Sequence, residues 1–336
     1  MNQAWQICGY SKSEVDRTAR ELAKNKIDGD KKIQYYDILA DFRSAHAYPI
    51  QSMINNFRNK AFDIDKNAIV VRRLKRIPSI LNKLRRQQTM RVSAMGDIGG
   101  IRVIVKNINM VYQLTKSIEH GRTQNKLVYK KDYLQNPKAS GYRGIHLTYS
   151  YGGNKQEYEK YRVELQIRSQ IQHSWATAVE VVGTFSRENL KAGKGNKNWL
   201  KLFAYISKAF TCLENNKKPK LSLVEKIKDL SNKLHVVEKL ESYLVATQEL
   251  NDFKSSDYIL LDLDVSNKVI SLFNFAKKFT KKAYEHFNLL EQRYAEDQSR
   301  DIVMVSANSI KDLKKAYPNY FSDTKDFQKT LNQIIA

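Results

Sequence analysis

The chain reads Asn136-Pro-Lys-Ala-Ser-Gly-Tyr-Arg-Gly-Ile-His146 and, further on, Val163-Glu-Leu-Gln-Ile-Arg168. Proline and glycine in the first stretch break regular structure and let the backbone approach a ligand closely. Its basic side chains and its tyrosine ring suit a ligand that is anionic and planar. The second stretch alternates apolar with polar residues, which predicts a strand with one face in a core. The polar face then presents Glu164 beside Gln166 and Arg168.

Hydrophobic periodicity predicts an α/β core with a mixed sheet around these two stretches. Residues 69–105 have the pattern of strand, helix and strand, and Pro78 opens the helix. A helix near 109–120 and strands near 126–128, 146–151 and 161–167 are expected to follow. Strands that alternate with helices are typical of α/β proteins.

We expect four segments along the chain. Residues 1–68 are predicted to form an N-terminal helical segment whose first helix is capped by Ser13, and residues 69–190 the α/β core. Residues 191–255 are predicted to be a helical extension. A hairpin, a helix, a strand and two more helices predict a small C-terminal α+β domain over residues 256–336, with strands of its own.

Composition excludes several classes of protein. The sequence lacks any run of about eighteen apolar residues, so we expect no membrane span. Its N-terminus lacks the basic-then-apolar order of a secretion signal. Cys8 and Cys212 are too few and too far apart for a disulfide framework or a cysteine-based zinc site. We therefore expect a cytoplasmic protein.

Positive charge dominates the chain, with 58 lysines and arginines against 35 acidic residues and a net charge of +23. A charge of that size attracts polyanions. Basic residues crowd the core, and lysines continue from Lys191 to Lys226. This excess favours an RNA backbone over a free nucleotide as partner, and we expect neither a membrane nor DNA.

Four motifs, in this order, resemble the synthetase domain of RelA/SpoT-type pyrophosphokinases. They are Arg73-Leu-Lys75 with Ser79 and Lys83, then Asp97-Ile-Gly-Gly-Ile-Arg102, then the loop 136–146, then Glu164-Leu-Gln-Ile-Arg168 with His173 and Trp175. The resemblance implies a nucleotidyltransferase-like synthetase core at residues 69–190. It also implies transfer of the β,γ-pyrophosphate of ATP to a ribose 3′-hydroxyl, with Mg²⁺ as cofactor.

The resemblance assigns a role to each motif. Asp97 and Glu164 are expected to be catalytic and to hold magnesium; without the other motifs, a turn cap and a strand ion pair would explain them. Arg73 and Arg102 are expected to stack on adenine, and Tyr142 on the acceptor base, where stacking contributes on the order of 1–3 kcal/mol. The full ATP-binding set is Arg73, Lys75, Ser79, Lys83, Arg102, Gln166 and Arg168, and the acceptor set is Lys138, Tyr142, Arg143 and His146.

Three interpretations of the core stay open. In the first, the acceptor is the 3′-terminal adenosine of tRNA, so that the modification blocks aminoacylation and translation. In the second, the acceptor is GDP or GTP and the product is an alarmone. The third is a nucleotide- or RNA-binding protein without activity, which intact Asp97, Tyr142 and Glu164 disfavour. The lysine excess favours tRNA.

The C-terminal segment carries Tyr317 and Tyr320 in a Tyr-x-x-Tyr spacing beside Pro318. Together with the core this resembles the CapRel fused toxin–antitoxins of anti-phage defence. The resemblance implies that the two tyrosines cover the adenine site and that a phage protein, such as the major capsid protein, binds the segment and releases it. The alternative is that both tyrosines are ordinary core residues. The segment has no cysteine pair, so packing must hold it together.

Overall fold

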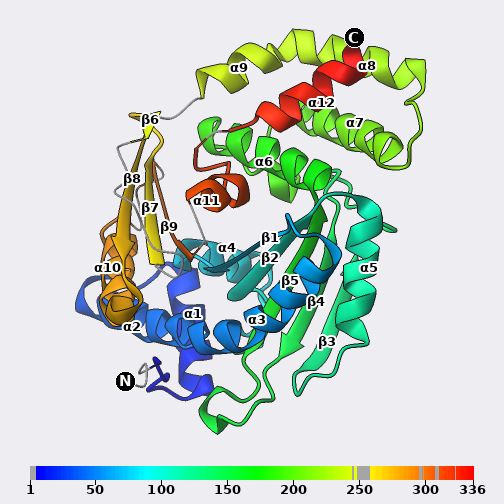
Figure 1. Ribbon diagram of the computed structural model, residues 1–336. Helices are drawn as coiled ribbons and strands as arrows, with labels where there is room; N and C mark the ends of the chain where they lie inside the picture. The colour runs from blue at the N-terminus through cyan, green and yellow to red at the C-terminus, as the bar shows by residue number, and fades with distance from the viewer. Residues whose placement is uncertain are drawn as a thin grey trace.

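The computed structural model describes residues 5–243, 246–247, 258–294, 297, 299–306, 310–321 and 323–336. A nine-stranded mixed sheet runs through it in the order β3-β4-β5-β2-β1-β9-β7-β8-β6. Helices cover both faces of this sheet (Figure 1). The predicted α/β class with a mixed sheet is confirmed.

Most elements lie where periodicity placed them. The strands are β1 (Ile69–Leu74), β2 (Gly99–Val105), β3 (Lys126–Asp132), β4 (Ile145–Ser150), β5 (Arg162–Ser169), β6 (Ala246–Thr247), β7 (Tyr258–Asp264), β8 (Val269–Phe275) and β9 (Arg300–Ser306). The α-helices are α1 (Lys12–Lys24), α2 (Gly29–Ser44), α3 (Ala47–Ile64), α4 (Ile77–Arg86), α5 (Ile108–Glu119), α6 (Gln170–Phe185), α7 (Lys197–Glu214), α8 (Leu221–Leu234), α9 (Val236–Ser242), α10 (Thr280–Arg293), α11 (Ile310–Ala316) and α12 (Lys325–Ile335). None of them, over the residues described, is long and apolar enough to cross a bilayer.

Local sequence fixes several helix ends. Ser11 caps α1, because its backbone is extended and its hydroxyl accepts a hydrogen bond from the Glu14 amide at 3.2 Å. The prediction that Ser13 is this cap was wrong, since Ser13 already lies in the first helical turn. Ser169 and Gln172 form a capping box at the start of α6, which fixes that helix directly after β5.

The two faces of the sheet bury different residues. Val70, Leu74 and Val103 point into the core beneath the N-terminal helices and α5. Val71 and Ile104, one residue out of phase, point to the opposite face and pack with Tyr317 and Tyr320 from the C-terminal part. The polar residues of the predicted site share this second face.

The C-terminal strands continue the sheet of the core. Strand β9 pairs antiparallel with β1, joining Arg72 to Ser306 and Arg73 to Val305. The expectation of a unit with strands of its own was wrong in this respect. Alternation along a strand reveals its buried face and gives no information about its neighbour, and β1 offers an edge that β9 fills. The predicted domain boundaries stay a prediction.

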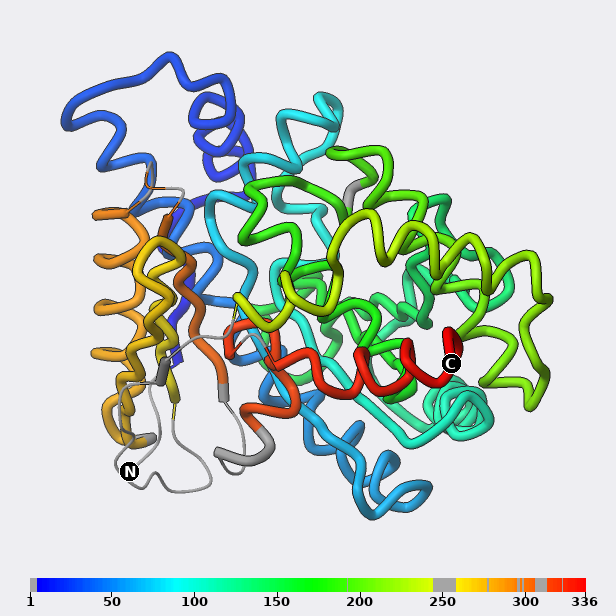
Figure 2. Tube along the Cα trace, turned by 90° about the horizontal axis from the view of Figure 1, so that it is seen from above, coloured from blue at the N-terminus to red at the C-terminus, as the bar shows by residue number. Residues whose placement is uncertain are grey.

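Helix α12 lies apart from the other C-terminal elements and packs on the helical extension (Figure 2). Phe327, which is fully buried, lies against Phe203 and Phe210 of α7, with ring centroids 6.2 and 5.8 Å away. Tyr317 and Tyr320 therefore lie between two anchors, the β9 strand and the α12 helix.

We expect Phe327→Ala to lower the free energy of unfolding by about 3–5 kcal/mol, because truncating a buried phenylalanine leaves a cavity. Chemical denaturation of the full chain measures this. Phe279→Ala, at a residue 43% exposed, is the matched control and should have a much smaller effect. Equal losses in the two variants would contradict the packing of α12.

Candidate active site

Strand register brings the predicted site residues into rows on one face of the sheet. Gly100 of β2 lies opposite both Arg73 of β1 and Glu164 of β5. Two residues further along the strand, Gln166 lies opposite both Arg102 and His146. Residues directly opposite on neighbouring strands point to the same face. Gly100 has no side chain, so nothing on β2 separates Arg73 from Glu164.

A closed ring of hydrogen bonds surrounds Glu164. Its two oxygens accept from His146 Nδ1 at 2.9 Å and from Gln166 Nε2 at 2.6 Å. Tyr142 donates its hydroxyl to His146 Nε2 at 2.5 Å. Arg168 completes the ring by donating to the Tyr142 oxygen at 2.8 Å and to Gln166 Oε1 at 3.1 Å. Each partner restrains the next, so Glu164 is held rigidly.

This ring keeps Glu164 ionised. Burial alone would raise its pKa, but His146 and Gln166 hydrogen-bond to the charged form and Lys75 attracts it, so the pKa lies below its usual value. Burial lowers the pKa of His146, against the pull of Glu164. We therefore assign a neutral imidazole. Its Nδ1–H donates a hydrogen bond to the carboxylate, and its Nε2 accepts a hydrogen bond from the Tyr142 hydroxyl.

Asp97 lies near enough to Glu164 for the two carboxylates to repel each other, and we call this group of residues and the arginines beside it the cleft. Its oxygens contact Lys75 Nζ at 3.0 Å and Lys83 Nζ at 2.8 Å. Burial acts to raise the pKa of Asp97, and the two ammonium groups more than offset it, while Glu164 is close enough to oppose them. The cleft therefore holds two ionised carboxylates with two lysines beside them.

Guanidinium groups crowd the neighbouring part of the same face. Arg102 is 6% exposed, and burial together with Arg168 and Arg73 lowers its pKa to about 10. Glu180 of α6 attracts Arg73 and Arg102 and pairs with Lys191 at 2.5 Å. Sequence reasoning missed this carboxylate. Its position two helical turns after His173 was the available signal, because that spacing keeps both residues on one helix face.

The C-terminal segment covers the arginines. The last carbonyls of α11 accept hydrogen bonds, Ala316 from Arg102 at 2.9 Å and Lys315 from His173 at 3.0 Å. Both carbonyls can accept these bonds because the last carbonyls of a helix have no partner within the helix. The Tyr317 ring lies 5.6 Å from the Arg102 guanidinium, and its hydroxyl donates to the Arg72 carbonyl at 3.0 Å.

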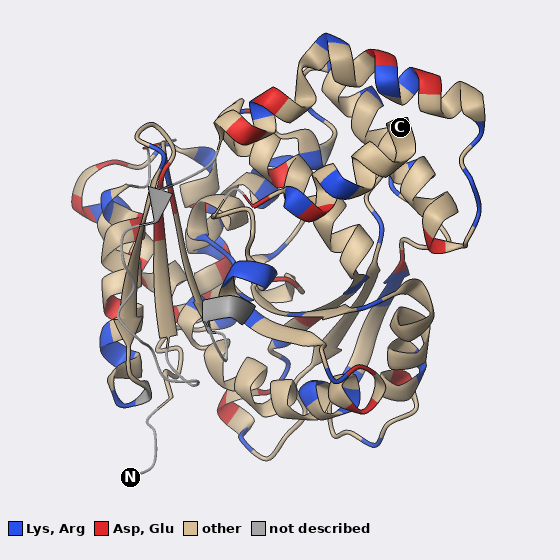
Figure 3. Ribbon diagram, turned by 45° about the horizontal axis from the view of Figure 1, so that its top comes forward, with Lys and Arg blue, Asp and Glu red and all other residues tan. Residues whose placement is uncertain are grey.

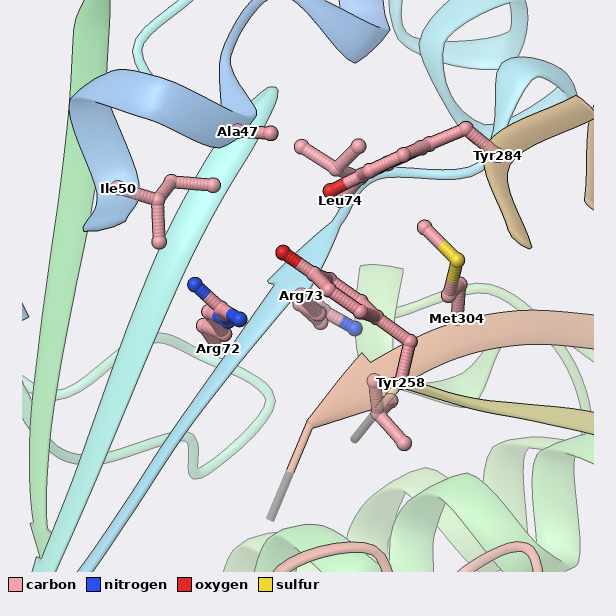
Figure 4. A pocket seen from close by; sticks show the side chains of 9 residues that line it. Ala47, Ile50, Arg72, Arg73, Leu74, Tyr258, Tyr284 and Met304 are labelled. Atoms are coloured by element: carbon pink, nitrogen blue, oxygen red, sulfur yellow. The ribbon is translucent and has the colours of Figure 1, made fainter. Parts of the chain in front are cut away.

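A second contact fixes the same segment. Tyr320 donates its hydroxyl to Asp301 at 3.1 Å, and Asp301 also pairs with Arg76. Figure 4 shows the junction of β1 with the C-terminal strands, where Arg72 lies beside Tyr258 in a small pocket. The Arg72 guanidinium is 4.9 Å from the Tyr258 ring. Both tyrosines of the 317–320 motif thus contact groups of the sheet.

The predicted acceptor residues are divided between two places. His146 and Tyr142 belong to the ring around Glu164, and Lys138 Nζ lies 5.0 Å from the Tyr142 ring centroid. The Tyr142 ring is 3% exposed in this conformation. Arg143 is not brought to the cleft: it is buried and pairs with Glu214 of α7, a partner that the sequence analysis did not predict.

The other predicted ATP-binding residue, Ser79, lies in the first turn of α4. No hydrogen bond joins it to the cleft residues in the described part of the chain. Trp175 is a structural residue, since its indole donates to the Phe203 carbonyl at 2.9 Å. The cleft itself is therefore formed by strand residues, Asp97, two lysines and α6.

A family model describing a region found in RelA / SpoT proteins matches residues 72–184. This chain carries a RelA/SpoT region. The matched residues include Asp97, Glu164, Arg73 and Arg102. The family-level resemblance expected from the motifs is confirmed.

Two curated proteins of Bacillus subtilis (strain 168) are similar to about a third of this chain. GTP pyrophosphokinase YjbM is 34% identical over 111 residues, 32% of this chain and 52% of the relative. GTP pyrophosphokinase YwaC is 32% identical over 111 residues, 31% of this chain and 52% of the relative. The chain thus spans about half the length of the curated relatives it matches.

Solved structures of such proteins are similar as well. The small alarmone synthetase 1 from Bacillus subtilis, bound to its product pppGpp, matches with a TM-score of 0.44 and 24% identity, covering 51% of this chain and 90% of that one. A GTP pyrophosphokinase family protein from Streptococcus pneumoniae matches with a TM-score of 0.45 and 22% identity, covering 59% and 96%.

The carboxylates of the RelA/SpoT region fit magnesium. Oxygen ligands from one or two carboxylates, completed by substrate phosphates and water, are what Mg²⁺ prefers. Asp97 and Glu164 supply such a pair. The described residues contain no group of three or more potential ligands that could form an all-protein metal cage. Lys75 and Lys83 now neutralise Asp97, and would be free to contact phosphates once a metal replaced them.

We expect the free energy of unfolding to fall as the pH drops from about 7 to about 5. Burial lowers the pKa of His173 to about 3 and that of His46 to about 4. A histidine whose folded pKa is lowered stabilises the fold above its unfolded pKa of about 6.5, and this stabilisation is lost as the pH falls. His173→Gln should make the slope of unfolding free energy against pH shallower by up to roughly 1.4 kcal/mol per pH unit. An unchanged slope in denaturation experiments at several pH values would contradict a buried neutral His173.

Proposed function

We propose that this chain is an ATP-dependent pyrophosphokinase: the ribose 3′-hydroxyl of the acceptor attacks the β-phosphorus of ATP, the bond to the α,β-bridging oxygen breaks, the pyrophosphate is transferred and AMP is released. The observation that carries the proposal is the cleft itself, in which ionised Glu164 faces Asp97, two lysines and an arginine cluster. Transfer of this kind depends on positioning and on stabilising the charge of the phosphates. The family match to residues 72–184 supports the same reaction class.

Each residue of the cleft has a part in this proposal. Glu164 accepts the proton of the attacking hydroxyl, directly or through water, and stays in place because His146 and Gln166 hold both of its oxygens. Magnesium, held by Asp97 and Glu164, would neutralise charge on the transferred phosphates. Lys75 and Lys83 would bind those phosphates, and the flat guanidinium groups of Arg73 and Arg102 would bind adenine.

The same chain would hold this activity in check. Tyr317 and the end of α11 contact Arg102, the group proposed to bind adenine. ATP and this segment would compete for one surface, so activity would require the segment to leave. We propose that a phage protein, such as a major capsid protein, binds the C-terminal part and stabilises the open state, as in CapRel proteins.

For the acceptor we propose the 3′-terminal adenosine of tRNA, so that modification would block aminoacylation. Support comes from the charge of the helical extension, where exposed lysines lie on α7, on α8 and in the loop between them (Figure 3). They include Lys197, Lys201, Lys217, Lys218, Lys220 and Lys226, and Lys194 is exposed just before α7. Lys191 is the exception, because it pairs with Glu180.

A guanosine nucleotide is the second candidate acceptor, making the chain a (p)ppGpp synthetase. The observation in its favour is that both curated relatives carry the name GTP pyrophosphokinase. The two candidates differ in where the label goes. Incubation with labelled ATP would give labelled RNA in one case and a labelled free nucleotide in the other.

We expect Glu164→Gln to lower the rate of transfer by about 10²–10⁴-fold, because it removes the proposed proton acceptor but keeps the shape of the side chain. The measurement uses full-length protein, ATP labelled at the γ-phosphate, and either tRNA or GDP. Asp97→Asn should have a comparable effect through the metal. Full activity in both variants would exclude the proposed chemistry. If the wild type transfers no label, whether or not the C-terminal segment has been released from the cleft, the chain is not a pyrophosphokinase.

We expect the double variant Tyr317→Ala, Tyr320→Ala to raise transfer roughly tenfold, which corresponds to about 1.4 kcal/mol of lost closed-state stabilisation. Expression of this variant should arrest growth, and adding Asp97→Asn should relieve the arrest. The control is Tyr317→Phe, Tyr320→Phe, which keeps both rings and removes only their hydroxyl hydrogen bonds. Unchanged transfer in the alanine variant would contradict autoinhibition.

A further inference from the structure

Strand β3 forms one edge of the sheet, next to β4 (Figure 1). Tyr129 lies opposite Thr148, and Thr148 lies opposite Glu164. Lys131 lies opposite His146. Tyr129 and Lys131 therefore point to the same face as the proposed catalytic groups. The Tyr129 side chain is exposed, with 53% of the residue accessible to solvent.

A β-bulge produces this arrangement. The register shifts between Leu127 and Tyr129, so that Leu127 opposes Tyr149 and Tyr129 opposes Thr148. The extra residue, Val128, turns the next side chain back to the cleft face. Both Lys126, which opposes Ser150, and Tyr129 then lie on that face. Bulges are enriched next to active sites, where they re-aim a side chain.

The second strand in from the edge, β5, adds positive charge beside Tyr129. Arg162 of β5 lies with its guanidinium 5.6 Å from the Tyr129 ring, and it donates to the Ala94 carbonyl. Within the described residues, no carboxylate lies at ion-pair distance from Lys126, Lys131 or Arg162. Lys130, between Tyr129 and Lys131 on the same strand, points to the other face and pairs with Glu119 of α5 at 2.9 Å.

We propose that Lys126, Tyr129, Lys131 and Arg162 form a binding surface for the single-stranded 3′ end of an RNA that enters the cleft. An unpaired row of cations contacts the phosphates, and an exposed aromatic ring between them stacks on a base. This combination is typical of single-stranded nucleic-acid sites. A duplex does not fit the tyrosine, since its bases are already stacked on each other.

This surface lies where the nucleotides that precede the reacting 3′-terminal ribose would be. Tyr129 lies two strand spacings, about 10 Å, from Glu164 across the sheet. A terminal ribose at Glu164 would leave the preceding part of the strand over β4 and β3. Thr148 of β4 lies between Tyr129 and Glu164, opposite both residues. The inference rests on the proposed function, because it deepens the choice of RNA as acceptor.

The test measures binding of a hairpin RNA that ends in a short single-stranded 3′ overhang, with the full-length protein and its C-terminal part intact. We expect Tyr129→Ala to weaken binding about tenfold, and Tyr129→Phe to leave it within about twofold, because the ring supplies the stacking. Lys131→Ala should weaken binding severalfold and reduce the slope of log affinity against log salt by about 1. The same hairpin with a blunt end should bind weakly and show no difference between variants.

The chain provides matched controls on the opposite face. Lys130→Ala removes the same charge from the adjacent residue, and Tyr112→Ala removes a ring that is 39% exposed on α5. Both should bind the overhang RNA like the wild type. Equal losses in Lys130→Ala and Lys131→Ala, or equal affinity for blunt and overhang RNA, would overturn the inference.

Failure of the inference and failure of the proposed function are distinguishable. If the wild type transfers label to tRNA while Tyr129→Ala does so equally well, RNA is the acceptor and this surface is not its site. If the overhang RNA binds as expected but only GDP is labelled, the surface stands and the tRNA reaction fails. A dimer of the wild type that Tyr129→Ala dissociates, seen by light scattering, would assign the edge to a second copy and overturn the RNA inference.

Discussion

The crowding of positive charge on one face of the sheet is the constraint on which the rest of this structure depends. Arg102 is buried beside Arg73 and Arg168, and its pKa of about 10 reflects what that costs. Buried charges of one sign need partners or a ligand. Glu164 and Glu180 supply part of the compensation, and the carbonyl end of α11 supplies more. A bound nucleotide would supply negative charge in the same place. The C-terminal segment that covers the arginines and the nucleotide would therefore compensate the same positive charge.

The same constraint explains why the cover is attached at both ends. Aromatic rings and helix carbonyls stabilise an arginine less than a polyphosphate does, because they carry only partial charges. Strand β9 holds the segment in the sheet, and Phe327 anchors it in the helical extension. Holding the segment close raises its effective concentration at the arginines. Weak contacts are then sufficient to cover the cleft.

Rigidity on the catalytic side comes from a different source. A closed ring of hydrogen bonds runs through Glu164, His146, Tyr142, Arg168 and Gln166. Its members come from β5, from β4 and from the loop before β4, and pairing of β4 with β5 fixes the register of the two strands. The hydrogen bonds close on themselves, and such closed networks restrain their members more than isolated pairs do. Tyr142 is thereby fixed, in this conformation, as part of the support of Glu164. Arg143, its neighbour in sequence, instead ties the loop to α7 through Glu214.

The sequence by itself determined the α/β class, most strands and helices, and the set of polar residues that share the cleft. It could do so because period-two alternation in β5 and the motif around Asp97 are local properties of the chain. Only the tertiary structure decided that β9 completes the sheet of the core, that Arg143 points away from the cleft, and that Glu180 joins it. The bulge that turns Tyr129 toward the cleft was equally hidden. Each of these depends on which distant segments pair, and pairing is settled by packing across the whole fold rather than by the pattern along one stretch.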